Sequence, residues 1–304
     1  MREFKSLSEL TSKIRSEQSA IDYFTSIRWR NGAFCPYCGS VKVYHFGDKK
    51  THKCGDCLQR FSIKVGTVFE GSKIPLRKWL MAIWLLTSHK KGIASTQLAK
   101  DIGVTQKTAW FIAHRIRHAK DTKSYNKPLE GEVEVDETFV GGKAKNRHKD
   151  KRGNSGVTGG AGKAIVVGAV ERKGRVVARV VENVRADTLT QFVRDNVSPS
   201  VDLVSTDKWV GYKHLGKEFP HVAVDHAAGE YVRGRAHTNT IEGYWSQLKR
   251  QIFGVHHWVS GKHLGRYVSE SSWRYNRRDL GEGERLNALI VGSDGRLTYQ
   301  GLIA

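Results

Sequence analysis

The sequence lacks a long apolar run, and this argues against a membrane-spanning helix. None of its 304 residues falls in a stretch near the roughly 18 consecutive apolar residues that a spanning helix needs. The opening residues, Met1-Arg2-Glu3-Phe4-Lys5, also lack the apolar segment of a secretory signal. We therefore expect a cytoplasmic protein.

Acidic residues are scarce relative to basic ones. The chain holds 51 Lys and Arg against 30 Asp and Glu, a formal net charge of +21 at pH 7. A field of this size attracts a polyanion and steers its approach, so it indicates a nucleic-acid partner. Solubility alone would not require the basic residues to cluster, but residues 141–155 contain six of them and a single acid. The six are Lys143, Lys145, Arg147, Lys149, Lys151 and Arg152.

Cysteine is also scarce, and four cysteines in a cytoplasmic chain do not suggest a disulfide scaffold. They form two Cys-x-x-Cys pairs, Cys35 with Cys38 and Cys54 with Cys57. Two such pairs offer four soft ligands on two tight turns, which suits one tetrahedral Zn²⁺ ion. We predict a structural zinc ribbon over residues 31–70, with short strands between and after the pairs, preceded by a helical lead-in over residues 1–30.

Residues 76–120 show helical periodicity and predict a helix-turn-helix domain. A short helix should end near Gly103, and a second should begin at a threonine cap. In such a pair the second helix enters the major groove of DNA. Its exposed face should carry the DNA-contacting residues Gln106, Lys107, Trp110 and His114. Arg115 could bind phosphates or belong to a solvated face.

Residues 130–280 change character and predict an α/β domain with an RNase H-like core. The alternation in Glu132–Val140 is typical of a strand. Further along, we expect a hairpin, a helix, a short strand, a helix, another short strand and two closing helices. Their ranges are 164–170 with 175–181, 187–196, 201–206, a start near 209, 221–224, 240–252 and 260–277. Residues 281–304 remain as a C-terminal tail.

Three acids in this domain suit a two-metal site for phosphoryl transfer. Asp136 lies on the first expected strand, Asp207 ends the fourth, and Glu242 opens a late helix. Carboxylates are the ligands that Mg²⁺ or Mn²⁺ prefers, and three of them can hold a pair of ions. We therefore expect Asp136, Asp207 and Glu242 to be catalytic.

Each of these acids has a competitor nearby. Glu134 shares a strand face with Asp136, while Asp202 competes with Asp207 from the start of its strand. Four further residues stay open as alternatives. Asp225 could be an auxiliary ligand, Glu230 is a weaker alternative to Glu242, and the remaining two, which could bind metal or DNA, are His237 and Asn239.

The sequence resembles bacterial insertion-sequence transposases that carry an N-terminal zinc ribbon and an ISXO-like DDE domain. The resemblance rests on motifs spread over nearly the whole chain. They are Arg28-Trp29, Cys35-Pro36-Tyr37-Cys38 and the segments 66–79, 135–143, 206–212, 237–250 and 274–278. The family's DDE triad falls on Asp136, Asp207 and Glu242. Some relatives carry Asn or His in the third place, where this chain has Glu.

The resemblance implies an enzyme that binds the terminal inverted repeats of its element, frees a 3′-hydroxyl and joins it to target DNA. The zinc ribbon and helix-turn-helix would read the ends, and the basic segment 141–163 would hold the backbone. The same backbone role would fall to Lys249, Arg250, Arg274, Arg277 and Arg278. Pairing two ends implies a homo-oligomer, a dimer or larger, associated with the nucleoid.

Two other functions fit the same composition. The chain could be a DNA-binding regulator with an inactive RNase H-like core, or an RNase H-like nuclease that cuts without strand transfer. Joining of a labelled element end in the presence of Mg²⁺ separates these functions from that of a transposase.

Overall fold

The computed structural model describes residues 4–120, 127–142 and 162–303, and the chain divides into two compact units. One unit consists of Met1–Thr122 with Asp279–Ala304, and the other of Lys123–Arg278. The expected basic residues between Lys143 and Arg152 lie outside the described residues. Within the described ranges no helix is both long enough and apolar enough to cross a membrane.

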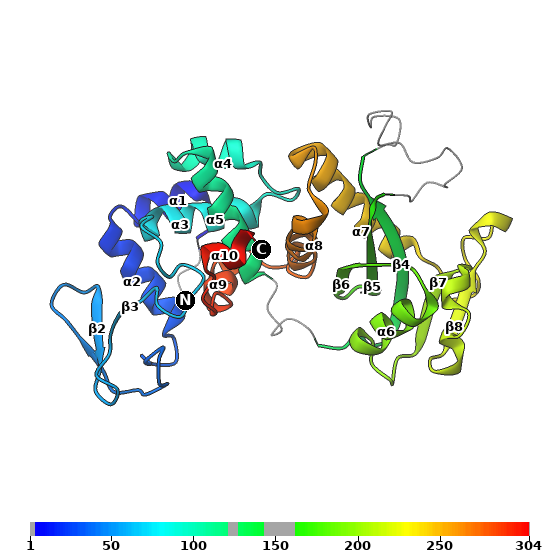
Figure 1. Cartoon of the computed structure of the whole chain (residues 1–304), viewed down its shortest axis with the longest axis horizontal. Helices are drawn as coiled ribbons and strands as arrows, with labels where there is room; N and C mark the ends of the chain where they lie inside the picture. The colour runs from blue at the N-terminus through cyan, green and yellow to red at the C-terminus, as the bar shows by residue number, and fades with distance from the viewer. Residues whose placement is uncertain (1–3, 121–126, 143–161, 304) are drawn as a thin grey trace. The chain divides into compact units, whose positions relative to one another are not determined.

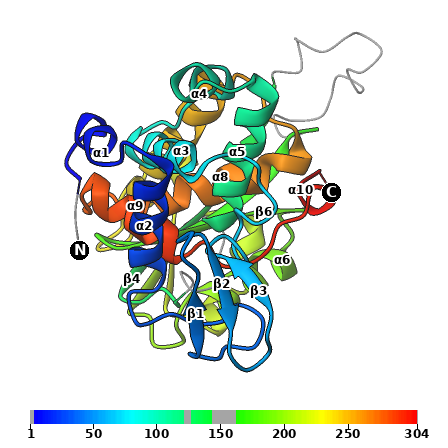
Figure 2. The same ribbon diagram turned by 90° about the vertical axis from the view of Figure 1, so that its left-hand side faces the viewer.

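A three-stranded antiparallel sheet forms the ribbon in the first unit, as the sequence predicts. Its strands are β1 (Val43–His45), β2 (Thr51–Cys54) and β3 (Arg60–Ser62), in that order across the sheet. Figure 2 shows the three strands side by side. Strands this short bury little apolar surface by themselves. The ring of Trp29 packs against them, with its centroid 4.8 Å from that of His52.

The rest of this unit is built around α3 (Leu76–Ser88), most of whose residues are buried. Helices from both ends of the chain pack on it. They are α1 (Leu7–Lys13), α2 (Glu17–Arg28), α4 (Ser95–Ile102), α5 (Gln106–Ala119) and α9 (Glu282–Val291). Residues 281–304, expected as a tail, therefore help to form the unit's core. Leu286, Leu289 and Ile290 are buried at helical spacing, and the short α10 (Tyr299–Ile303) packs on α5.

The turn between α4 and α5 follows the sequence prediction. Gly103 ends α4 with a left-handed φ of 61°, a conformation in which glycine has no steric penalty. Thr105 caps α5, because its side chain accepts a hydrogen bond from the Thr108 backbone N–H. These two residues fix where one helix ends and the next begins.

The second unit is an α/β layer structure around a five-stranded sheet of order β6-β5-β4-β7-β8. Strand β4 is antiparallel to β5 and parallel to β7, and β7 is parallel to β8. The strand bounds are β4 (Glu132–Val140), β5 (Ala164–Glu171), β6 (Val176–Val181), β7 (Leu203–Asp207) and β8 (His221–Val224).

Helices cover both faces of this sheet (Figure 1). On one face α6 (Ala186–Asn196) packs on the side chains of Val133 and Val135. On the other face α7 (Asn239–Lys249) and α8 (Gly261–Tyr275) pack on Val140 and Val166. The alternation of side chains along β4 divides its residues between these two cores.

Two helices expected from the sequence take a different form. The segment after Asp207 forms two short 3₁₀ turns, Val210–Tyr212 and Leu215–Lys217, rather than an α-helix. The backbone there runs close to α6, since a Cβ on Gly211 would lie 2.7 Å from Leu189 Cδ1. The helix expected over 240–252 ends at Lys249 and continues as a π-helical turn, Arg250–His256.

Gly168 determines how closely α7 approaches the sheet. It lies on β5 directly opposite Asp136 of β4. A Cβ at this position would lie 2.6 Å from Cη2 of Trp245, which belongs to α7. The absence of a side chain therefore leaves the space that the Trp245 indole fills.

We predict that Gly168→Ala destabilises this unit by about 1 to 3 kcal/mol, because the added methyl overpacks a filled site. Unfolding in urea, followed by fluorescence, measures the change. Gly243→Ala is the control on α7, the helix that carries Trp245, because a Cβ at Gly243 would meet nothing within 4 Å. Alanine at that helical position should instead stabilise by about 1 kcal/mol. Equal effects of the two substitutions would contradict the close fit at Gly168.

Candidate active site

The parallel pairing of β4 and β7 brings two of the expected acids together. Glu134 pairs with Ser205, and the same register continued by two residues sets Asp136 level with Asp207. Side chains at level positions of neighbouring strands lie on the same face of the sheet, so the carboxylates of Asp136 and Asp207 lie side by side. Carboxylate oxygens of Asp136, Glu137 and Asp207 all lie within 4.8 Å of one another.

Glu137 is a member of this group that reasoning from the sequence missed. As the next residue of β4 it begins on the opposite face from Asp136. There the hydroxyl of Tyr212, a buried residue that follows Asp207 in the chain, donates to Glu137 Oε2 at 2.8 Å. An acid directly after Asp136 was visible in the sequence, but its hydrogen-bond partner depends on the tertiary fold.

Burial disfavours the charged forms of all three acids, and neighbouring carboxylates add to this effect for Asp136 and Glu137. Burial and the charge of Asp207 raise the pKa of Asp136 to about 6. Burial raises the pKa of Glu137 to about 7, although its bond from Tyr212 acts in the opposite direction. Burial also raises the pKa of Asp207. A divalent cation among these oxygens would offset the repulsion, so this donor set fits Mg²⁺ or Mn²⁺.

A hydrogen bond from α7 orients Asp136. The indole Nε1 of Trp245 donates to Asp136 Oδ2 at 2.9 Å. This bond favours the ionised carboxylate and opposes part of the rise in its pKa. The Trp245 side chain is thus packed over Gly168 and bonded to the acid on the neighbouring strand.

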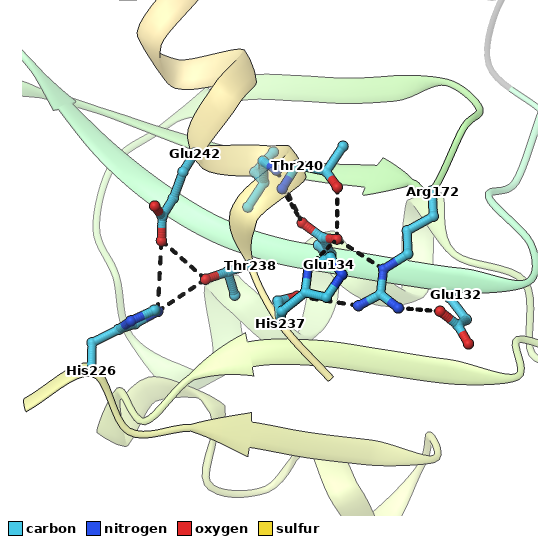
Figure 3. Close-up of polar contacts among 9 residues, drawn as sticks. Glu132, Glu134, Arg172, His226, His237, Thr238, Thr240 and Glu242 are labelled. Atoms are coloured by element: carbon cyan, nitrogen blue, oxygen red, sulfur yellow. Dashed lines mark hydrogen bonds and ion pairs between the residues drawn. The ribbon is translucent and has the colours of Figure 1, made fainter. Parts of the chain in front are cut away.

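Glu242 lies outside the group of three, on the first turn of α7. Its side chain is 52% exposed, and it accepts a hydrogen bond from Thr238 Oγ1 at 3.1 Å. His226 Nε2 lies 3.6 Å from Glu242 Oε1 and 2.9 Å from the same hydroxyl (Figure 3). The charge of Glu242 still contributes to the raised pKa of Asp136, so the two acids are near enough to interact.

The competing acids have other partners. Glu134 is completely buried between Arg172 and the N-terminus of α7 (Figure 3). Asp225 pairs with Lys208 at 2.9 Å and Glu230 pairs with Arg233 at 2.6 Å, while Asp202 is exposed at the far end of β7.

The two residues left open between metal and DNA contact lie at the start of α7. His237 Nδ1 lies 3.0 Å from Glu134 Oε1. This side of the ring therefore faces Glu134 and not the group of Asp136, Glu137 and Asp207. Asn239 is the first residue of α7 and is exposed.

The four cysteines come together at one end of the ribbon. Cys35 Sγ lies 3.6 Å from Cys57 Sγ, and Cys38 Sγ lies 3.6 Å from Cys54 Sγ. All four sulfurs lie within 4.8 Å of one another. A Zn–S distance of about 2.3 Å places the sulfurs of a regular tetrahedron about 3.8 Å apart. The arrangement therefore fits a single tetrahedral zinc ion.

Two residues of α5 that were expected to contact DNA make contacts within the fold. His114 is completely buried, and its ring centroid lies 3.9 Å from that of Trp110, itself partly buried. Arg115 Nη1 donates to the carbonyls of Val68 and Glu70, both at 3.0 Å. The expectation of an exposed His114 was wrong because α5 packs on α3, α4 and α10 and so buries more of its surface. Gln106 and Lys107 are exposed.

One of the arginines expected to hold DNA backbone is also buried. Arg274 pairs with Glu270 at 2.9 Å and donates to Gln251 Oε1 at 2.7 Å, so its charge is used inside the fold. Arg277 lies over the ring of Trp273, and Arg278 donates to the carbonyl of Gly174 at 3.0 Å. Lys249 and Arg250 are exposed at the end of α7, as a DNA contact requires.

Comparisons with known proteins match both units. The family model of the ISXO2-like transposase domain matches residues 128–276, and that of the transposase zinc-ribbon domain matches residues 15–60. The chain is 31% identical over 266 residues to an "Uncharacterized protein in transposable element ISH50" of Halobacterium salinarum (strain ATCC 700922 / JCM 11081 / NRC-1). That match covers 83% of this chain and 88% of the relative.

One solved structure, "Crystal structure of the Mos1 mariner paired end complex with Mn", matches at a TM-score of 0.19 and 10% identity. The match covers 66% of this chain and 78% of that chain. A TM-score of this size supports no conclusion about either unit.

The raised pKa of Asp136 predicts a substitution that stabilises the protein in buffer without Mg²⁺. An ordinary Asp titrates near pH 4, whereas Asp136 titrates at about 6 in the fold, so its ionisation costs stability. The cost grows between about pH 4 and pH 6 and is complete above that range. We expect Asp136→Asn to stabilise by about 1 to 3 kcal/mol at pH 8 and by little at pH 4.

Urea unfolding at the two pH values, with the ribbon loaded with zinc, measures this difference. Asp202→Asn, an exposed acid at the other end of β7, is the control and should have a small effect at both values. A gain from Asp136→Asn that is equal at pH 4 and pH 8 would refute the electrostatic explanation.

Proposed function

The chain belongs to the family of ISXO2-like transposases, and we propose that it binds the terminal inverted repeats of an insertion sequence, cleaves each element end and joins the freed 3′-hydroxyl to target DNA. The observation that carries this proposal is the acidic group at the point where β7 ends beside the middle of β4. Asp136, Glu137 and Asp207 offer oxygens within 4.8 Å of one another, and Glu242 lies close enough for its charge to act on Asp136.

We propose that the unit Lys123–Arg278 has an RNase H-like fold. Its support is the strand order β6-β5-β4-β7-β8, with three antiparallel strands first and two parallel strands after them. In this arrangement the first and fourth strands lie in the centre as neighbours. The acids that they carry are Asp136 and Asp207, and the helix that follows the last strand carries Glu242.

Asp136, Asp207 and Glu242 would hold two Mg²⁺ or Mn²⁺ ions as catalytic residues. When bound, the ions would supply activation of the attacking oxygen and stabilisation of the leaving oxygen. Trp245 keeps Asp136 directed toward Asp207 through its 2.9 Å hydrogen bond. Thr238 and His226 hold Glu242 on the first turn of α7, and its half-exposed side chain remains accessible to a phosphate.

We further propose that the first unit reads the element ends. The exposed residues Gln106 and Lys107 lie at the start of α5, where the second helix of a helix-turn-helix meets base edges. Lys249 and Arg250 are exposed beyond the candidate site and would contact the DNA backbone. Two ends have to be joined in one reaction, so the active form would contain at least two copies of the chain.

A strand-joining assay tests the reaction. A labelled duplex with the element's own end is incubated with target DNA, Mg²⁺ and the full chain, and joined products are separated by size. Each of three substitutions should lower the rate of joining by roughly 100-fold or more, because each removes a metal-binding charge. They are Asp136→Ala, Asp207→Ala and Glu242→Gln. Binding of the end duplex, measured by gel shift, should persist in all three variants.

The same assay separates the proposed reaction from its two competitors. A regulator would bind the end duplex and neither cut nor join it, and a nuclease would cut it without joining. Joining that survives in the Glu242→Gln variant would remove Glu242 from the proposed triad while leaving the transposase assignment intact.

Zinc in the ribbon gives a second test. We propose that the chain binds one structural Zn²⁺ through Cys35, Cys38, Cys54 and Cys57. Elemental analysis should find one zinc per chain, and Cys54→Ser should lose it, together with end binding, because the short ribbon strands depend on the metal. The Asp136→Ala variant should keep its zinc. A native chain without zinc would refute the metal assignment.

A further inference from the structure

We propose that Glu134 is a positioning residue: its buried carboxylate holds the first turn of α7 on β4 and thereby sets where Glu242 lies relative to Asp136. This inference rests on the proposed function, since it assigns a purpose to the placement of Glu242. Glu134 has no exposed surface, and it lies two residues before Asp136 on the same face of the strand.

The carboxylate of Glu134 takes the place of a local helix cap. Its Oε2 accepts from the backbone N–H groups of Thr240 at 2.8 Å and Ile241 at 3.1 Å, and its Oε1 accepts from Thr240 Oγ1 at 2.8 Å. The first N–H groups of a helix have no partner within the helix and attract a negative charge. Here the partner comes from the neighbouring strand, as Figure 3 shows.

Thr238, the residue in the usual capping position, consequently has a free hydroxyl for a different contact. Thr238 precedes α7, and its side chain makes no capping hydrogen bond to the helix backbone. Its hydroxyl donates instead to Glu242 Oε1 at 3.1 Å and lies 2.9 Å from His226 Nε2. The strand-borne Glu134 therefore leaves Thr238 to hold the side chain of Glu242.

The buried charge of Glu134 is balanced from the other side. Arg172, in the turn between β5 and β6, places Nε 2.9 Å from Glu134 Oε1 and also pairs with Glu132. His237 Nδ1 lies 3.0 Å from the same oxygen. A buried carboxylate needs such partners to offset its desolvation. Glu134 thus joins β4, the β5–β6 turn and the start of α7 at one point.

A second bond completes the attachment of the helix to the strand. Trp245 of α7 donates to Asp136, while Glu134 of β4 accepts from the first turn of α7. Glu242 lies between these two attachments along the helix. Because a helical segment of this length is stiff, fixing both points relative to β4 fixes Glu242 relative to Asp136.

The test measures metal affinity rather than activity alone. The full chain, with its ribbon loaded with zinc, is titrated with Mn²⁺, and free Mn²⁺ is followed by electron paramagnetic resonance. Glu134→Gln replaces one acceptor oxygen with a donor amide, so the first turn of α7 loses a partner. We expect Mn²⁺ to bind roughly tenfold more weakly, as for other residues that orient metal ligands.

Glu132→Gln is the matched control. Glu132 lies on the same strand and pairs with the same Arg172, but its other recorded partner is Arg235 rather than α7. Its side chain is 24% exposed, so we expect a change in Mn²⁺ affinity of less than about twofold. An equal loss in both variants would show that the charge of the strand, not the attachment of α7, controls the affinity.

A double substitution shows whether Glu134 acts through Glu242. Glu242→Gln should weaken Mn²⁺ binding, and adding Glu134→Gln should then cause no further loss, because the ligand that it positions is gone. If Glu134→Gln weakens binding tenfold in that background as well, it acts independently of Glu242 and the proposal is wrong. Unchanged affinity in the single Glu134→Gln variant also overturns it.

A milder pair of variants covers the case in which Glu134→Gln does not fold. Thr240→Val removes the hydroxyl donor to Glu134 but keeps the shape of the residue, whereas Thr240→Ser keeps the donor. Weaker Mn²⁺ binding in Thr240→Val, restored in Thr240→Ser, supports the proposal, and equal binding in the two opposes it.

The outcome also separates this inference from the proposed function. Mn²⁺ binding that is insensitive to both Asp136→Asn and Asp207→Asn would refute the proposed catalytic metal site. Binding that depends on those acids but not on Glu134 or Thr240 would leave the site standing and overturn the positioning role.

Discussion

The parallel pairing of β4 with β7 is the constraint on which the candidate site depends. It sets Asp136 level with Asp207, where β7 ends beside the middle of β4, and a carboxylate oxygen of Glu137 lies within 4.8 Å of theirs. Placing these acids together raises their pKa values and costs folding free energy. The sheet therefore holds carboxylates in an arrangement that is unfavourable without a cation, which is a common property of metal sites.

Hydrogen bonds at two points attach the helix α7 to β4. The strand provides Glu134 to the helix N-terminus, and the helix provides Trp245 to Asp136. Gly168 on the next strand leaves the space that the indole needs. The contacts of Gly168, Glu134 and Trp245 all hold α7 on the sheet. A change in any one of them should therefore affect the position of Glu242.

The first unit depends on elements from both ends of the chain and on its cysteines. Helix α3 forms its centre, and α9 from the C-terminal segment completes the core beside α2. The ribbon strands are too short to be stable by themselves, and four sulfurs at tetrahedral spacing supply the site at which a metal would hold them.

Patterns between residues near one another in the sequence determined much of the fold. The spacing of the four cysteines predicted the ribbon. Gly103 predicted where α4 ends, and Thr105 predicted where α5 begins. The period-two alternation in Glu132–Val140 predicted β4, and the resemblance to transposases of insertion sequences predicted the family. The ribbon spacing, the helix boundaries and the strand alternation depend on local backbone geometry, so the sequence alone reveals them.

Tertiary structure alone decided which side chains meet. The sequence placed Asp136 and Asp207 at strand positions, but the hydrogen bond that Glu137 accepts from Tyr212 joins segments far apart in the chain. Glu134 looked like a competing ligand, but the fold buries its carboxylate against α7 and Arg172. His114 and Arg274 are residue types that often contact DNA, yet packing buries both. Contacts of this kind join segments that are distant in the chain. Local sequence patterns therefore do not predict them.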